Sequence, residues 1–131
     1  MTFERSVTIL GCRDVPRSAE WFRDVLGFHL DPEIGLFGDD PDEGPVYAIV
    51  DRDGVNLHLQ IRRLDLPAGR EEIETDAYFY VTDVDALYAE LKSTGVLHPV
   101  SRDGISTTDF GTREFATLDR DGNLISFFRW E

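Results

Sequence analysis

Apolar residues recur at helical spacing in two stretches of the chain. The first stretch begins after Asp14 and ends before Gly27, and the second runs from Asp83 to Gly95. Aspartate is a common residue at the start of a helix and glycine a common one at its end. The apolar stripes consist of Val15, Ala19, Phe22 and Leu26 in the first stretch and of Val84, Leu87, Tyr88 and Leu91 in the second. We interpret both stripes as helix faces that pack on a sheet.

Shorter stretches rich in apolar residues predict strands. They are residues 6–12, 46–50, 55–61, 77–81, 113–118 and 124–129. Two pairs of these strands are joined by short polar turns, Asp53-Gly54 in one pair and residues 121–123 in the other, and each pair is expected to form a hairpin. Residues 32–45 and 99–111 hold so much Pro, Gly and Asp that we expect loops there.

The chain contains an internal repeat. The tetrapeptide Asp-Arg-Asp-Gly occurs at residues 51–54 and again at 119–122, 68 residues later. The helix start at Asp14 recurs at Asp83, 69 residues later. Two ordered matches at nearly the same offset indicate a duplicated module of about 60 residues that reads strand, helix, then strands. We therefore expect one domain over residues 1–131, with modules at approximately 5–62 and 75–130.

Composition and charge limit the classes of partner. The chain has 131 residues, 41% of them hydrophobic, which suffices for one folded domain. Its formal net charge of −13 repels nucleic acid and anionic lipid and attracts cations, although acidity also serves solubility. No stretch is apolar enough for a membrane span and the N-terminus does not resemble a signal peptide, so we expect a cytoplasmic protein. The single cysteine, Cys12, excludes an intrachain disulfide, and we expect it to be buried.

Alternation along two strands separates their two faces. Asn56, His58 and Gln60 lie on the face opposite the apolar residues of 55–61. Tyr78 and Tyr80 likewise share one face of 77–81. One face of each strand packs on a helix, and the other either contacts water or lines a binding site. Two tyrosines on one face can line a pocket, or they can be ordinary half-buried surface residues.

Three longer motifs carry a family resemblance. They are RDVPRSAEWF at residues 13–22 with Leu26-Gly27-Phe28, VDALYAE at 84–90, and FGTREFA at 110–116 leading into Asp121-Gly122-Asn123. Together they resemble the vicinal-oxygen-chelate superfamily, which includes glyoxalase I, extradiol dioxygenases, fosfomycin-resistance enzymes and bleomycin-resistance proteins, and they are most similar to the last branch. The resemblance implies an α+β fold in which two tandem βαβββ modules form a curved mixed sheet around a cup, the glyoxalase/bleomycin-resistance fold.

The resemblance also identifies the positions of a metal site. Enzymes of this superfamily hold a divalent metal with His and Glu side chains from four strands, and the corresponding residues here are Val7, His58, Asp76 and Ser126. Valine cannot coordinate a metal, and Ser126 replaces the usual Glu. His58 and Asp76 are weak candidates by themselves, because such sites ordinarily need three or more protein ligands. No glycine-rich nucleotide motif is present either. We therefore expect no metal, no cofactor and no catalytic residue.

The resemblance further implies where a ligand binds. The drug-binding groove of the bleomycin-resistance branch corresponds to Tyr47, His58, Gln60, Tyr78 and Phe110. Phe110 and Tyr78 both stand where that branch has a larger indole, which allows a different ligand. In those relatives two subunits pair, and the drug is held in grooves at their interface without being altered. The sequence thus predicts a homodimer that sequesters a flat or cationic small molecule, bleomycin-like in the narrowest version.

Two enzymatic hypotheses remain open. A metal-dependent glyoxalase-like lyase or dioxygenase would use His58, Asp76 and water or a nonstandard ligand. A metal-free enzyme would use His58 or Asp76 as a general base, although no spacing selects either residue. Acidic clusters at 39–43 and 71–76 lie close to Tyr47 and Tyr78 in sequence. They either attract a cationic ligand or form solvated loops.

Overall fold

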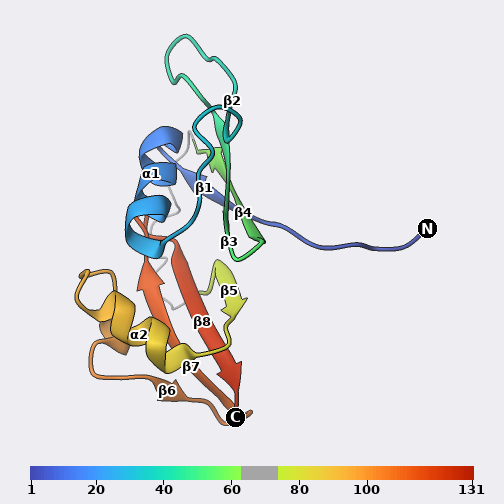
Figure 1. Cartoon of the computed structure of the whole chain (residues 1–131). Coiled ribbons are helices and arrows are strands. Elements are labelled where there is room, and N and C mark those ends of the chain that lie inside the picture. Colours follow the sequence, from blue (N-terminus) through green and yellow to red (C-terminus); the bar gives the residue numbers. More distant parts are fainter. Residues whose placement is uncertain (63–73) are drawn as a thin grey trace. The chain divides into compact units, whose positions relative to one another are not determined.

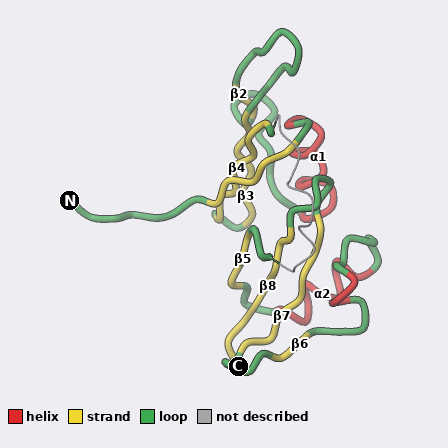
Figure 2. Tube along the Cα trace, turned by 180° about the vertical axis from the view of Figure 1, so that it is seen from behind, coloured by secondary structure: helices red, strands yellow, loops and turns green. Residues whose placement is uncertain are grey.

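The computed structural model describes residues 1–62 and 74–131. Contacts within the chain divide it into two compact units, unit 1 from Met1–Asp65 and unit 2 from Leu66–Glu131. Each unit has the order strand, helix and three strands, and in each the helix lies against one face of a four-stranded mixed sheet (Figures 1 and 2). The predicted α+β fold with two βαβββ modules is confirmed, with one sheet in each module.

Unit 1 is built around a sheet with the strand order β1-β4-β3-β2. Its elements are β1 (Thr8–Cys12), α1 (Val15–Leu26), β2 (Leu36–Phe37), β3 (Tyr47–Arg52) and β4 (Val55–Ile61). Strand β1 runs parallel to β4, and the other pairs are antiparallel. Residues 1–7 extend away from the start of β1 (Figure 1).

Unit 2 repeats this topology with the strand order β5-β8-β7-β6. Its elements are β5 (Ala77–Tyr80), α2 (Val84–Lys92), the short 3-10 helix η1 (Pro99–Ser101), β6 (Ser106–Thr107), β7 (Thr112–Leu118) and β8 (Leu124–Trp130). Strand β5 is parallel to β8, and the other pairs are antiparallel. No helix among the described residues is long and apolar enough to cross a membrane.

Both helices start at the predicted caps, but only the first ends where predicted. Asp14 accepts a hydrogen bond from the Arg17 N–H at 3.1 Å, and α1 ends at Gly27, whose φ is 70°. Asp83 accepts from the Ala86 N–H at 2.9 Å. The prediction that this helix extends to Gly95 is wrong, because α2 ends at Lys92. The N–H and hydroxyl of Thr94 both bond to the Leu91 carbonyl, at 3.0 and 2.7 Å, and this tighter bonding ends the α-helix early.

The two segments predicted to be plain loops contain short regular elements. Strand β2 lies within 32–45, and η1 and β6 lie within 99–111. Strand β2 pairs with the start of β3, and β6 pairs with the start of β7. These strands are two residues long, so their pairing depends on a neighbouring strand edge and leaves little local sequence signal.

Each core lies between the helix and the sheet. The helix α1 packs on β3 and β4, and α2 packs on β7 and β8. The buried residues of unit 1 include Leu10, Cys12, Phe22, Leu26, Val50, Leu57 and Leu59, and those of unit 2 include Ala77, Val84, Leu91, Phe115, Ile125 and Phe127. Alternate residues of each central strand point the other way, so each sheet has a second face that its own helix does not cover.

Candidate ligand-binding site

On the second face of the unit 1 sheet, Tyr47 and His58 form a contacting pair. The Tyr47 hydroxyl lies 2.8 Å from His58 Nδ1, and the two rings meet edge to face with centroids 5.4 Å apart. Gln60 lies on the same face, directly across from Tyr47 in the antiparallel pair of β3 and β4. The structure therefore places three of the five expected ligand-binding residues on one face.

The surroundings of His58 favour the uncharged form of its imidazole. Burial lowers its pKa below the ordinary value of 6.5, and the positive charge of Arg5 lowers it further. Either neutral tautomer forms the bond to Tyr47, with the hydroxyl donating to Nδ1 or accepting from it. In both cases the pair presents polar groups without net charge, which suits hydrogen bonding to a ligand.

The second face of the unit 2 sheet carries five aromatic rings in contact. The ring of Tyr78 stacks in parallel on Phe128, with centroids 3.9 Å apart, and Tyr80 meets Phe128 edge to face at 5.2 Å. The centroid of the Trp130 ring lies 6.3 Å from the ring centroids of both Phe128 and Phe110. We call Tyr78, Tyr80, Phe110, Phe128 and Trp130 the aromatic face.

Four of these five side chains are substantially exposed. The exposed fractions are 44% for Tyr78, 53% for Tyr80 and Trp130, and 65% for Phe110. Contiguous exposed apolar surface of this kind is typical of binding sites. Ring planes that stand both parallel and perpendicular to one another leave faces and edges open for stacking on a planar molecule.

A carboxylate lies at the edge of the aromatic face. Glu114 on β7 is paired with Phe128 on β8, and its Oε2 accepts hydrogen bonds from the hydroxyls of Tyr78 and Thr112, the latter at 3.0 Å. Thr112 Oγ1 in turn lies 2.7 Å from the hydroxyl of Thr108. Burial and the bond to Glu114 raise the pKa of Tyr78 above 10, so Tyr78 remains a hydrogen-bond donor at neutral pH.

Sequence reasoning did not select four residues of this site. They are Tyr80, Glu114, Phe128 and Trp130, although Tyr80 was recognised as sharing a face with Tyr78. The signal was available in the alternation of 124–130, which places Ser126, Phe128 and Trp130 on one face of β8.

The four positions that hold a metal in superfamily enzymes do not form a fitting donor set. Val7 has no donor atom, and Ser126 is a buried hydroxyl that lies across from Tyr78 and Ala116. The Oδ2 atom of Asp76 accepts a hydrogen bond from the Leu124 N–H at 2.8 Å, which fixes β5 beside β8. Over residues 1–62 and 74–131 no group of three or more His, Cys, Asp or Glu is placed to hold a metal ion.

The first acidic cluster, at residues 39–43, forms hydrogen bonds within its own loop. In the first cluster, Oδ1 of Asp40 accepts from the N–H groups of Asp42 and Glu43 at 2.9 and 3.0 Å, so this carboxylate organises its own loop. In the second cluster, Glu71 and Glu72 lie outside the described residues.

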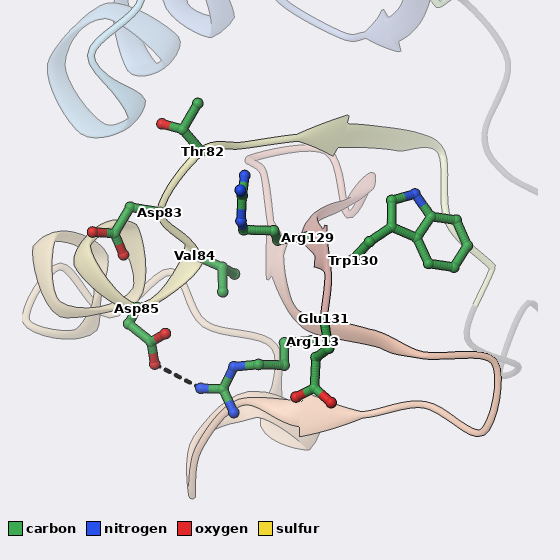
Figure 3. A pocket seen from close by; sticks show the side chains of 8 residues that line it. All are labelled: Thr82, Asp83, Val84, Asp85, Arg113, Arg129, Trp130 and Glu131. Atoms are coloured by element: carbon green, nitrogen blue, oxygen red, sulfur yellow. Dashed lines mark hydrogen bonds and ion pairs between the residues drawn. The ribbon is translucent and has the colours of Figure 1, made fainter.

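A hollow of about 310 Å³ lies beside the N-terminus of α2 in unit 2, and Trp130 of the aromatic face is part of its lining (Figure 3). Its lining residues are Thr82, Asp83, Val84, Asp85, Arg113, Arg129, Trp130 and Glu131. Figure 3 shows Arg113 pointing toward Asp85, and their charged groups approach to 2.6 Å. The three carboxylates of the lining offset the two guanidinium groups, and none of the five residues expected to bind ligand lies in this hollow.

Comparison with known proteins assigns the chain to a family. The family description of the Glyoxalase/Bleomycin resistance protein/Dioxygenase superfamily matches residues 6–127, and the chain belongs to this superfamily. The resemblance inferred from the three sequence motifs is therefore confirmed.

Several relatives within the superfamily are named for bleomycin. The bleomycin resistance protein of Geobacillus stearothermophilus is 28% identical over 138 residues, which covers 95% of this chain and 96% of that protein. Among solved structures, the bleomycin-binding protein of bleomycin-producing Streptomyces verticillus, complexed with copper(II)-bleomycin, is 28% identical. Its TM-score is 0.73, and the match covers 100% of this chain and 99% of that one.

A glyoxalase-related enzyme from Clostridium phytofermentans has the same fold with a TM-score of 0.75. It is 20% identical, and the match covers 100% of this chain and 98% of that one. At this identity the likeness concerns the fold alone, because members of one fold can differ in function.

Proposed function

We propose that this protein sequesters a flat or cationic small molecule without altering it, and that the aromatic face is the principal contact. The observation that carries the proposal is the group of five contacting rings, four of them substantially exposed, on the sheet face opposite α2. A planar ligand stacked on such rings gains about 0.5 to 1.5 kcal/mol per ring pair beyond the burial of apolar area. Within unit 1, Tyr47, His58 and Gln60 stay the predicted ligand-binding residues.

The relatives support a bleomycin-like ligand as the narrow form of the proposal. Two of them, the bleomycin resistance protein and the bleomycin-binding protein, are each 28% identical to this chain over nearly its whole length. By the same likeness we propose a homodimer that binds its ligand without a metal of its own. A cytoplasmic location stays a prediction from the sequence.

Calorimetric titration with metal-free bleomycin tests the narrow proposal. We expect saturable heat at micromolar drug, and we expect Tyr78→Ala to weaken binding at least about tenfold because it removes an exposed stacking ring. The matched control is Tyr88→Phe. Tyr88 lies on the helix side of unit 2, where its hydroxyl donates to the Ser101 carbonyl at 2.8 Å.

A second measurement tests the broader proposal with other planar compounds. Trp21 and Trp130 are the two tryptophans of the chain, so Trp21→Phe leaves Trp130 as the single indole reporter. We expect a planar ligand to quench Trp130 fluorescence in this variant. If bleomycin gives no heat, the narrow proposal is wrong. If a set of planar cations and neutral heterocycles also leaves Trp130 unquenched, the aromatic face is not the ligand site.

A further inference from the structure

We infer that Glu114 selects the ligand of the aromatic face by charge, and that the preferred ligand class is a planar ring system bearing a protonated amine or guanidinium group. This inference rests on the proposed function and specifies the ligand class for the same site. Three observations carry it: the bonding of the two carboxylate oxygens, the distribution of cationic side chains over unit 2, and the position of Glu114 next to the stacked rings.

The two carboxylate oxygens of Glu114 accept different numbers of hydrogen bonds from the protein. Oε2 receives both hydroxyl donors, from Tyr78 and Thr112. Over the described residues, Oε1 receives no hydrogen bond from a protein group. Two donors on one oxygen fix the orientation of the carboxylate, and Oε1 keeps its capacity to accept a bond from a ligand.

The cationic side chains of the unit 2 sheet come from strand positions on its other face, and one of them, Arg129, reaches round so that its guanidinium carbon lies 5.8 Å from the centroid of the Tyr80 ring. Arg113 and Arg129 face each other in the pairing of β7 and β8, and Arg113 is bonded to Asp85 of α2. The alternate positions on the side of Glu114 are Thr112 and Ala116 on β7 and Ser126, Phe128 and Trp130 on β8. Within the described strands the positions beside Glu114 hold no cationic residue, and the Arg129 guanidinium contacts Tyr80 rather than this carboxylate.

The position of Glu114 joins its charge to the stacking surface. Its strand partner Phe128 is stacked by Tyr78, and the Tyr78 hydroxyl is itself bonded to Glu114. A planar molecule lying on these rings brings a substituent at its edge within reach of Oε1. A charged hydrogen bond between a ligand cation and a carboxylate is worth about 1.5 to 3 kcal/mol, and the electron-rich ring faces also favour a cation. A neutral ligand gains stacking alone.

Three acridines that differ in charge test the inference by calorimetry. At neutral pH 9-aminoacridine is a cation, acridine is neutral and acridine-9-carboxylate is an anion. We expect the wild-type protein to bind the cation at least about tenfold more tightly than the neutral compound and the anion most weakly. In Glu114→Gln, which keeps the shape and an oxygen acceptor, we expect the preference for the cation over acridine to fall at least about fivefold, while the affinity for acridine stays unchanged.

Two further variants serve as controls. Glu90→Gln makes the same chemical change at an exposed position on α2 and is expected to keep the full preference for the cation. Glu114→Asp keeps the charge on a shorter side chain and is expected to keep part of the preference. Because Glu114→Asp and the wild-type charge series both report on selectivity, the inference is still tested if Glu114→Gln does not fold.

The outcomes separate this inference from the proposed function. Equal affinity of the wild-type protein for the cation and the neutral compound, or an undiminished preference in Glu114→Gln, would overturn the role of Glu114 and leave the aromatic face as a ligand site. If no acridine binds, both proposals fail. If Trp130→Ala dissociates a dimer without changing the affinity for 9-aminoacridine or for acridine, a second copy of the chain occupies the aromatic face and the inference is wrong.

Discussion

At the scale of single residues, the two potential metal ligands at the superfamily positions bond to their own neighbours. Asp76 bonds to the backbone of β8, and His58 bonds to Tyr47. The position that carries Glu in superfamily enzymes is the buried Ser126. Each of these residues has a structural role within its own unit, so its residue type alone does not indicate catalysis.

The low pKa of His58 has a consequence for stability. The unfolded chain protonates this histidine near pH 6.5, whereas the folded state does so only at lower pH. The contribution of uncharged His58 to the free energy of unfolding is therefore fully present above pH 6.5. It decreases as the pH falls through 6.5 toward the pKa of the folded state. We expect the melting temperature to decrease across this range and the decrease to be smaller in His58→Gln.

Nuclear magnetic resonance checks the same prediction directly. We expect the Cε1 proton of His58 to titrate below pH 6.5. A His58 midpoint above 6.5, or identical pH dependence of stability in the wild-type protein and His58→Gln, contradicts it.

At the scale of elements, the two copies of Asp-Arg-Asp-Gly form different turns. In the first copy β3 ends at Arg52 and β4 starts at Val55, so the turn has two residues, both with positive φ. In the second copy a longer loop separates β7 from β8, and Oδ1 of Asp119 accepts from the N–H groups of Asp121 and Asn123. A shared tetrapeptide therefore marks the hairpin and leaves its geometry to the flanking residues.

The first of these turns depends on Gly54. Its φ is 81°, and an added Cβ would have no neighbour within 4 Å, so Gly54→Ala tests backbone conformation without a steric clash. We expect it to lower the free energy of unfolding by about 1 to 2 kcal/mol. Urea denaturation measures the change. Asp53→Asn is the control, because asparagine also tolerates the φ of 52° at this position, and it is expected to change stability by less than about 0.5 kcal/mol.

The elements that could be predicted from the sequence are those that depend on residues close together in the chain. The caps at Asp14, Gly27 and Asp83 and the hairpin at Asp53-Gly54 were predicted because each depends on residues close together in the chain. The two-residue strands β2 and β6 were not, since they form by pairing with a strand edge. In β8 four consecutive residues, Leu124, Ile125, Ser126 and Phe127, are buried, so apolar and polar positions do not distinguish the two faces, and only the two-residue spacing from Ser126 places Phe128 and Trp130 together.

At the scale of the whole molecule, we expect neither stability nor ligand binding to depend on a metal ion. Because the four superfamily positions do not supply a fitting donor set, we expect a chelator to leave the melting temperature and the affinity for 9-aminoacridine unchanged. Elemental analysis of purified protein before and after treatment with EDTA provides the check. Near-stoichiometric Mn, Fe, Ni or Zn that is lost in His58→Ala would favour the metal-dependent enzyme instead.

The net charge of −13 acts on a cationic ligand before contact is made. Long-range attraction raises the rate of association, whereas the dissociation rate depends on the stacking and the bond to Glu114. Raising the salt concentration from about 10 mM to about 1 M shortens the screening length from about 30 Å to about 3 Å. We therefore expect stopped-flow measurements to show slower association of 9-aminoacridine at high salt, with little change in dissociation and no change for neutral acridine. Glu114→Gln should show the complementary pattern, with faster dissociation of the cation and nearly unchanged association. If salt slows the neutral compound as much as the cation, the attraction is not electrostatic and the acidity of the chain serves solubility alone.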